Sequence, residues 1–545
     1  MKKTMIAAAM LVLGTGAASA QGAMDAYKLG TTELNGTARY LSMGGAFGAL
    51  GGDVSVMKDN PAGIAVYRSS EIATSLSLNA ISAESNFSGS IYSDDKTRLS
   101  FDNIAYVGYF PTGNDENLIS WNVGFSYNKI KNFNKNYGMA GRQDFSISDF
   151  IANRSTGLPL AGITGDKAYE NSDWLSVLGY DAGLMDVYED TPGGKKDQYF
   201  SPFGDFNDKG EWTPYKLTNS QLRVQESGAI NLYTVSAGAN ISNFLMLGAS
   251  LLITDISYDL SSKYDETFEY EDNDLYLDNT LSTTGSGYQV NIGAILSPTD
   301  YLRLGVAYNS PTWYKMTDYY YAEAASNYTY MEKGQLKEES YKANTPYDPD
   351  PRPFTDYQFR SPDKWLFSAA AIIGKYALVS VDYELTNYKN MKMKDFQGYS
   401  NQPTNTDIRH YFQNGSTVRV GFEGKVTPQF AIRAGYSYSN SPIKTEFNNA
   451  LNARNAVQTE VRTVGTIPHF TIDKGVTNYT FGIGYRFTPS FYTDIACVLR
   501  SHKEDLYAFS MMPADEKLGY TEIKSQAATL KTNTVKVALT LGYKF

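Results

Sequence analysis

The amino-acid sequence predicts an all-β fold, a transmembrane antiparallel β-barrel of about 14 strands with an N-terminal hatch inside its lumen. Three observations lead to this prediction. Apolar and polar residues alternate repeatedly from about residue 70 to the C-terminus. The connections between the alternating segments are short and long in turn. A short, glycine-rich segment precedes the first of them.

The first residues of the chain predict export. Lys2-Lys3, a short apolar run and Ala18-Ser19-Ala20 follow the order of a secretory signal peptide. We therefore expect residues 1–20 to be removed by cleavage before Gln21. No later stretch approaches the roughly 18 consecutive apolar residues of a membrane-spanning helix.

The hatch is predicted at residues 21–68, where glycine and alanine are dense between Gly36 and Ala65. Glycine permits close backbone packing and positive φ, and Asn-Pro followed by Gly is a turn signal. A flexible linker or a phosphate-binding loop is the alternative, but the glycine spacing of a phosphate loop is missing and apolar residues are closely spaced. The hatch residues that we single out are Gly44, Gly45, Gly48, Asn60, Pro61, Ala62 and Gly63.

The barrel wall is predicted at residues 69–545. From Val535 to Phe545 every odd residue is apolar or aromatic and every even one is polar or small, which indicates a strand with two different faces. The same pattern recurs at 430–438 and 479–487. Short turns such as Thr427-Pro428 alternate with long connections, of which 132–227 is the largest. Short turns on one membrane face and long loops on the other are typical of outer-membrane barrels.

Composition excludes several classes of function. The net charge of −10 argues against a nucleic-acid partner, which would favour a basic surface. The 43 Tyr and 27 Phe residues suit the aromatic girdles of a barrel. Cys497 is the single cysteine, and His410, His469 and His502 are expected in loops or at a strand rim, on the surface. No metal-ligand or nucleophile–base spacing is evident, so we expect a protein that is not an enzyme and has no metal or cofactor.

Charged residues on the inward positions of the strands are candidates for ligand contact. An arginine could meet a ligand carboxylate, because its planar guanidinium matches that group. The alternative is a self-neutralising lumen in which ion pairs hold the hatch. The candidates are Arg303, Arg419, Arg433 and Arg486.

The largest connection contains apolar residues at roughly helical spacing. Exposed apolar surface on a loop often indicates binding, which would make this loop a capture site. The alternative is a small subdomain that packs on itself. The candidate capture residues are Phe145, Phe150, Ile151, Leu175 and Leu178.

These features resemble one family. AR-x-x-x-MGGAF-x-A-x-GGD-x-S at 38–55 and NPAGIA at 60–65 look like the hatch signature of the long-chain fatty acid transporter (FadL) family. The segments at 302–314, 418–442, 467–470 and 479–487 also resemble that family, although the long 132–227 connection departs from it. The resemblance implies a 14-stranded barrel in the outer membrane of a Gram-negative-type cell, with hydrophobic ligands caught by loops and released sideways at a kinked third strand.

We therefore expect a passive, monomeric channel, surrounded by outer-membrane lipid, for fatty-acid-like molecules or aromatic hydrocarbons. A haemin-binding or adhesin-type receptor that uses the long loops is the alternative. Glycine inside a strand often marks a bend, so Gly124 in the third strand is the candidate for the lateral gap. The other interpretation of Gly124 is a small inward residue that makes room for the hatch.

Overall fold

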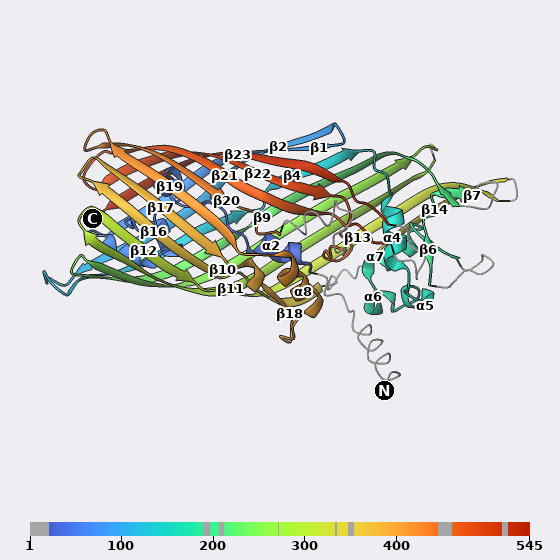
Figure 1. Ribbon diagram of the computed structural model, residues 1–545, viewed down its shortest axis with the longest axis horizontal. Helices are drawn as coiled ribbons and strands as arrows, with labels where there is room; N and C mark the ends of the chain where they lie inside the picture. The colour runs from blue at the N-terminus through green and yellow to red at the C-terminus, as the bar shows by residue number, and fades with distance from the viewer. Residues whose placement is uncertain are drawn as a thin grey trace.

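The computed structural model describes residues 21–188, 197–206, 212–270, 272–332, 335–346, 354–444, 460–514 and 522–545. It shows a long, tilted β-barrel with helical segments inside it and at one end (Figure 1). The predicted signal peptide lies outside the described residues. Within these ranges, no helix has the length and apolar character needed to span a bilayer.

The wall is one antiparallel sheet that closes on itself, because β1 pairs with both β2 and β23. Three spans are interrupted: β12 continues as β13, β15 as β16, and β17 as β18. Counting each of these as one, the described residues form 14 spans, as the alternation predicts. The wall strands are β1 (Glu71–Phe87), β2 (Ser90–Pro111), β3 (Leu118–Asn132), β9 (Leu217–Ile241), β10 (Leu245–Phe268), β11 (Asp274–Thr299), β12 (Leu302–Asn309), β13 (Trp313–Glu332), β15 (Phe354–Arg360), β16 (Lys364–Ile373), β17 (Ala377–Thr386), β18 (Lys392–Asp395), β19 (Gly415–Lys425), β20 (Phe430–Ser439), β21 (Phe470–Arg486), β22 (Phe491–Tyr507) and β23 (Ala527–Lys544).

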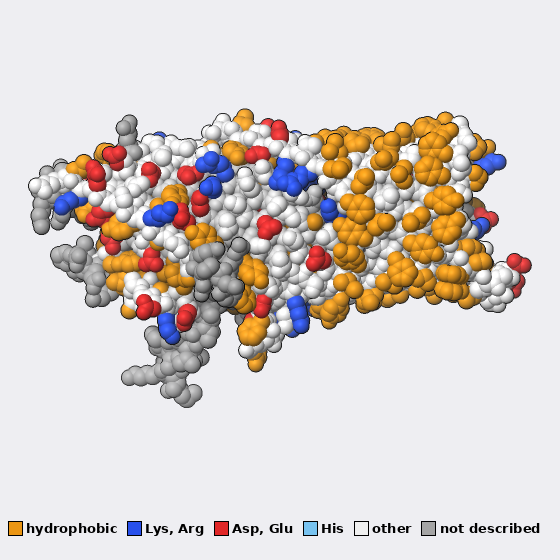
Figure 2. Space-filling model, turned by 180° about the vertical axis from the view of Figure 1, so that it is seen from behind, with side chains coloured by type: hydrophobic (Ala, Val, Ile, Leu, Met, Phe, Trp, Pro, Cys, Tyr) orange, Lys and Arg blue, Asp and Glu red, His pale blue; other side chains and the backbone are white. Residues whose placement is uncertain are grey.

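An apolar band surrounds one end of the barrel. Figure 2 shows this band at the end where Figure 1 places the C-terminus, with charged side chains over the rest of the surface. Exposed aromatic residues such as Trp121, Trp365, Phe481 and Phe545 belong to it. A band of this kind faces hydrocarbon in outer-membrane barrels. The strands continue well beyond the band, so the extracellular half of the barrel stands outside the bilayer.

The hatch is a chain of short helices inside this barrel. It comprises α2 (Ala23–Gly30), α3 (Ala38–Ser42) and the 3₁₀ turns η1 (Val54–Lys58) and η2 (Pro61–Val66). Side chains start three of these turns: Thr37 accepts from Tyr40 N, Asp53 from Ser55 N and Asn60 from Ala62 N. Such caps satisfy the free N–H groups at a helix start. The hatch therefore keeps its shape without a sheet of its own.

The wall accepts the hatch through a belt of inward glycines. Gly238, Gly248 and Gly293 are register partners on β9, β10 and β11, and Gly421 and Gly435 are partners on β19 and β20. A Cβ at Gly248 would overlap the backbone of Pro61 and Ala62, and one at Gly421 would stand 2.6 Å from Met43 O. The remaining members of this glycine belt are Gly124, Gly305 and Gly482.

The extracellular end carries a helical subdomain between β3 and β9. It contains β4 (Lys135–Gly141), α4 (Ile147–Ser155), α5 (Leu160–Ile163), α6 (Ala168–Asn171), α7 (Trp174–Asp181), β5 (Asp186–Val187), β6 (Tyr199–Phe200), β7 (Gly204–Phe206) and β8 (Trp212–Pro214). Elsewhere at this end lie β14 (Gln335–Asn344), η4 (Tyr388–Asn390) and α8 (Gln402–Tyr411).

The predicted capture residues form the core of this subdomain. Phe150, Ile151, Leu175 and Leu178 are buried, and Phe145 is partly buried against the same cluster. The prediction of an exposed apolar groove at these five residues is therefore wrong. Their helical spacing places them on the faces by which α4 and α7 pack together.

We expect a side chain in the glycine belt to destabilise the protein. Gly435→Val would place atoms against the backbone of Met43 and Gly44, and overpacking of this kind typically costs about 1–3 kcal/mol. The free energy of unfolding is measured by urea titration in lipid vesicles. Gly162→Ala is the control, because a Cβ there meets only ordinary contacts. Equal destabilisation by the two substitutions would contradict the close approach.

Candidate ligand-binding cavity

A cavity of about 330 Å³ lies in the lumen between α2 and the rest of the hatch. Tyr27 and Lys28 of α2 line it on one side, and Tyr40, Lys58 and Asp59 of the hatch line it on another. Inward residues of the strands complete the wall. A concave, enclosed site with a mixture of apolar and polar groups is the usual form of a small-molecule site.

Helix α2 and the residue Gln21 before it are bound to three strands of the wall. Lys28 Nζ lies 2.7 Å from Glu226 Oε1 on β9, and Tyr27 donates a hydrogen bond of 2.9 Å to Asp473 on β21. Gln21 Nε2 donates to Asp318 on β13 at 2.9 Å. Burial alone would lower the pKa of Lys28, but the adjacent Glu226 raises that pKa above its ordinary value. The ammonium group therefore remains charged and holds α2 in place.

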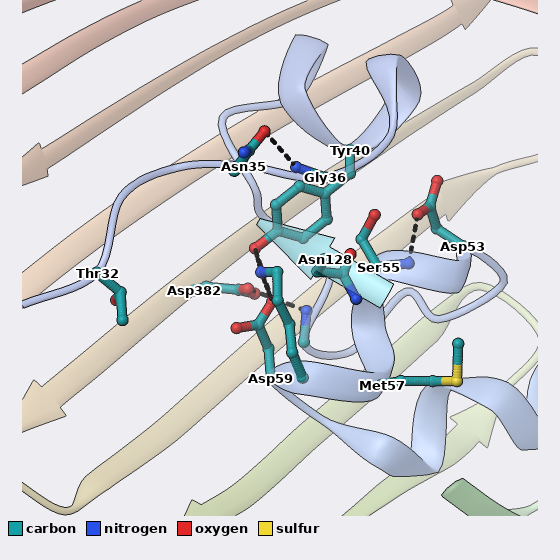
Figure 3. A network of polar contacts seen from close by, with 12 residues as sticks. Thr32, Asn35, Gly36, Tyr40, Asp53, Ser55, Met57, Asp59, Asn128 and Asp382 are labelled. Carbon is teal, nitrogen blue, oxygen red and sulfur yellow. Dashed lines mark hydrogen bonds and ion pairs between the residues drawn. The ribbon is translucent and has the colours of Figure 1, made fainter. Parts of the chain in front are cut away.

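The hatch side of the cavity is a polar network (Figure 3). Tyr40 Oη donates to Asp59 at 2.7 Å, and Lys58 Nζ lies 2.8 Å from the same carboxylate. Asp382 of β17 accepts a hydrogen bond of 2.9 Å from Gly48 N. The aromatic ring of Tyr40 lies in the middle of this group of residues, as the figure shows. The hatch thus contacts the wall through hydrogen bonds as well as through the glycine belt.

The four candidate arginines have different surroundings. Arg433 is buried between Glu423 and Asp494, at 2.6 Å from each, and Glu423 also pairs with Arg39 of the hatch at 2.9 Å. This is the self-neutralising lumen of the alternative interpretation. Arg303 donates to Leu50 O of the hatch at 2.7 Å.

The other two arginines differ from this arrangement. Arg419 lines the cavity but is paired with Glu384 at 2.6 Å. Arg486 is exposed on β21 beside the turn to β22, so its side chain does not reach the cavity. Ligand contact by these arginines remains a prediction for Arg419 alone.

His469 is a cavity residue that the sequence did not reveal. It is 5% exposed, so the expectation of a surface histidine is wrong for this residue. Burial, helped by the charge of Lys28, lowers its pKa to about 3, and Glu226 opposes this only in part. The imidazole is therefore neutral at physiological pH. Its position just before a strand gives no periodic signal that could have identified it.

The third strand is regular at Gly124 and irregular further along. Gly124 is paired with Val107 on β2 and with Ser236 on β9, so the gap predicted at this residue is absent. A Cβ there would overlap Met57 of the hatch, in agreement with the other interpretation of Gly124. The ladder to β2 ends at Asn128, and the register to β9 shifts between Lys129 and Lys131.

A closed barrel in an apolar band, filled by its own N-terminal segment, defines an outer-membrane barrel of the transport type. The model of the outer membrane protein transport family (OMPP1/FadL/TodX) matches residues 267–507. The chain therefore resembles that family over these residues, and its fold agrees with the match. No curated protein sequence matches significantly.

The chain is similar to several solved structures at low sequence identity. The chain is similar to a FadL homologue of Pseudomonas aeruginosa, with a TM-score of 0.51 and 14% identity over 95% of this chain and 100% of that one. The toluene transporter TodX of Pseudomonas putida gives a TM-score of 0.47 and 12% identity over 95% and 100% of the two chains. The toluene transporter TbuX of Ralstonia pickettii gives 0.45 and 12% over 94% and 99%.

Loss of Arg433 should destabilise the protein strongly. Arg433→Met leaves Asp494 buried without its cation, and removal of one partner of a buried pair typically costs about 3–5 kcal/mol. Arg486→Met is the matched control, since an exposed arginine should change the free energy of unfolding by less than about 0.5 kcal/mol. Both are measured by urea unfolding in lipid vesicles. Similar effects of the two substitutions would refute the structural role of Arg433.

The buried, neutral His469 should make stability depend on pH. Its folded pKa of about 3 lies below the unfolded value of 6.5, so the unfolded state binds a proton first as the pH falls. The free energy of unfolding should therefore decrease by roughly 1 kcal/mol per pH unit below the unfolded pKa. His469→Gln should remove this contribution, which is measured as the difference between wild type and variant at neutral and at acidic pH. A difference that does not change with pH would contradict the burial of a neutral imidazole.

Proposed function

We propose that this protein is a passive channel that brings hydrophobic or amphipathic small molecules across the outer membrane. The observation that carries the proposal is the position of the cavity. The hatch elements other than α2 pack against the wall on the side of the cavity nearer the apolar band, while the cavity borders the stretch of β3 where the ladder to β2 has ended and the register to β9 shifts. An apolar ligand could pass through the wall at that stretch into the lipid without entering water.

The interrupted stretch supports a lateral exit at the outer edge of the apolar band. From Ser120 to Asn128, β3 is paired on both sides over a length that suits one crossing of the hydrocarbon layer. Beyond it, residues 130–135 line the cavity. Among the described residues, β4 pairs with β9 alone, and it faces β2 through side chains such as Lys96, which donates to Asn136 at 3.1 Å. Side-chain contacts can separate without unfolding a ladder.

Several similar proteins are named for cargo of this class. TodX and TbuX are described as toluene transporters, and CymD as a monoaromatic hydrocarbon channel. We carry over only the general class, an apolar or amphipathic small molecule, because these sequences are 12% identical or less to this chain. The cavity residues of this chain decide which member of that class fits.

A reversible crosslink tests the exit. Cysteines at Lys96 and Asn136, in a Cys497→Ser background, are joined by a short disulfide-containing bis-maleimide in cells that lack other transporters of this class. We expect uptake of a radiolabelled long-chain alcohol, and of the acid and the alkane of equal chain length, to fall severalfold. Reduction of the linker should restore it.

The matched control joins β10 to β11. Cysteines at Lys263 and Asp278, an exposed pair 2.9 Å apart across a continuous ladder, receive the same linker. Uptake should be unchanged. Undiminished uptake with a complete crosslink at Lys96 and Asn136 would place the exit elsewhere, and absence of uptake of all three probes by the uncrosslinked protein would contradict the channel itself.

A further inference from the structure

The cavity wall contains buried polar atoms that lack hydrogen-bond partners within the described part of the chain. They are Asn134 Oδ1, Asn309 Oδ1, Asn478 Oδ1, Thr532 Oγ1 and His469 Nδ1, and the last four belong to residues that are 7%, 6%, 2% and 5% exposed. Buried polar atoms are nearly always paired, with protein, water or a ligand. A group of five around a single cavity indicates what kind of ligand the cavity binds.

These atoms are mainly acceptors. An amide oxygen can only accept, whereas a neutral imidazole such as that of His469 has one nitrogen that accepts and one that donates. Asn478 Nδ2 already donates to Ser437 Oγ at 2.9 Å, which turns the amide oxygen the other way. The side chain of Thr532 carries a hydroxyl group, which can both donate and accept a hydrogen bond. Most of the unpaired atoms in the cavity wall therefore require a hydrogen-bond donor from the ligand.

Two of the acceptors lie just above the hatch, on different parts of the wall. Thr480, two residues from Asn478 on β21, donates to Ser42 O of the hatch at 3.0 Å. Asn291, the register partner of Asn309, donates to Lys58 O of the hatch at 2.8 Å. His469 is near Lys28 and so close to α2. The unpaired atoms therefore extend across the cavity from the rest of the hatch to α2.

The cations of the cavity are already engaged. Both arginines that line it are paired, Arg419 with Glu384 at 2.6 Å and Arg500 with Glu33 at 3.3 Å. Lys131 has no ion pair among the described residues, but it donates to Lys28 O and Thr31 Oγ1 of the α2 segment. A carboxylate ligand would have to break one of these contacts, and it would bring acceptors to a site that already has a surplus of them.

We propose, on the basis of the channel function above, that the cargo is an uncharged amphiphile whose polar end carries hydroxyl or amide N–H donors. Its apolar body would lie along residues such as Ile130, Phe133 and Ile230, which also line the cavity. A pure hydrocarbon would displace water from the acceptors and return no hydrogen bond, which costs affinity. A fatty carboxylate would add charge without donors.

Binding to the mature protein in lipid nanodiscs tests this inference with three probes of equal chain length: a long-chain alcohol, the corresponding fatty acid and the corresponding alkane. Equilibrium binding of radiolabelled probes should place the alcohol at least about tenfold tighter than the other two. Asn309→Leu, Asn478→Leu and His469→Leu should each weaken the alcohol about fivefold and leave the alkane unchanged.

The matched control is Asn103→Leu. Asn103 is also buried and its Oδ1 is also without a partner among the described residues, but it is not part of the cavity lining. This variant should bind all three probes as the wild type does. Heat-modifiable migration on gels identifies variants that fold.

Each outcome decides one of the two proposals. Tightest binding of the fatty acid, or alcohol binding that the three cavity variants leave unchanged, would overturn the donor-bearing amphiphile while the channel function stands. No binding of any probe by a folded wild-type protein would contradict the channel function itself.

Discussion

The structure depends on the close approach between the hatch backbone and the glycines of the barrel wall. At Gly248, Gly293 and Gly435 the two chains meet with no space for a side chain. Glycine provides this space on a strand at the expense of strand stability, because it has the highest conformational entropy in the unfolded chain and no side chain to pack. The neighbouring strands compensate through long, continuous ladders. The hatch backbone can therefore pack directly against the strands at these positions.

Ion pairs between the hatch and the wall fix the orientation of the hatch. The pairs Arg39–Glu423 and Lys28–Glu226 tie two helices of the hatch, α3 and α2, to different strands, and both carboxylates are buried. A buried pair adds little net stability, but it penalises every arrangement that leaves one partner alone. The hatch is thus fixed in one orientation. The cavity is the space that this orientation leaves between α2 and the remaining turns.

The sequence predicted the barrel because alternation and loop rhythm are local patterns that repeat many times, and it predicted the hatch because its glycines are dense. The partners of the hatch were harder to find. Gly248 or Gly435 is one small residue on an inward face, and only the closed wall shows that these residues form a belt. Arg433 and Arg486 occupy equivalent positions in the alternation, yet one is buried between two carboxylates and the other is exposed at the rim. His469 lies outside any periodic segment, and Gly124 marks contact with Met57 rather than a bend. Long-range contacts decide each of these cases.

We propose above all that the N-terminal segment closes an otherwise open barrel. The most direct test is the ion conductance of the purified protein in planar bilayers, compared with that of a variant that lacks residues 22–67. We predict negligible conductance for the complete protein and stable, ohmic channels for the shortened one, because removal of the hatch leaves a wall of 14 spans around a water-filled lumen. A folded, inserted variant that conducts no better than the complete protein would contradict the claim.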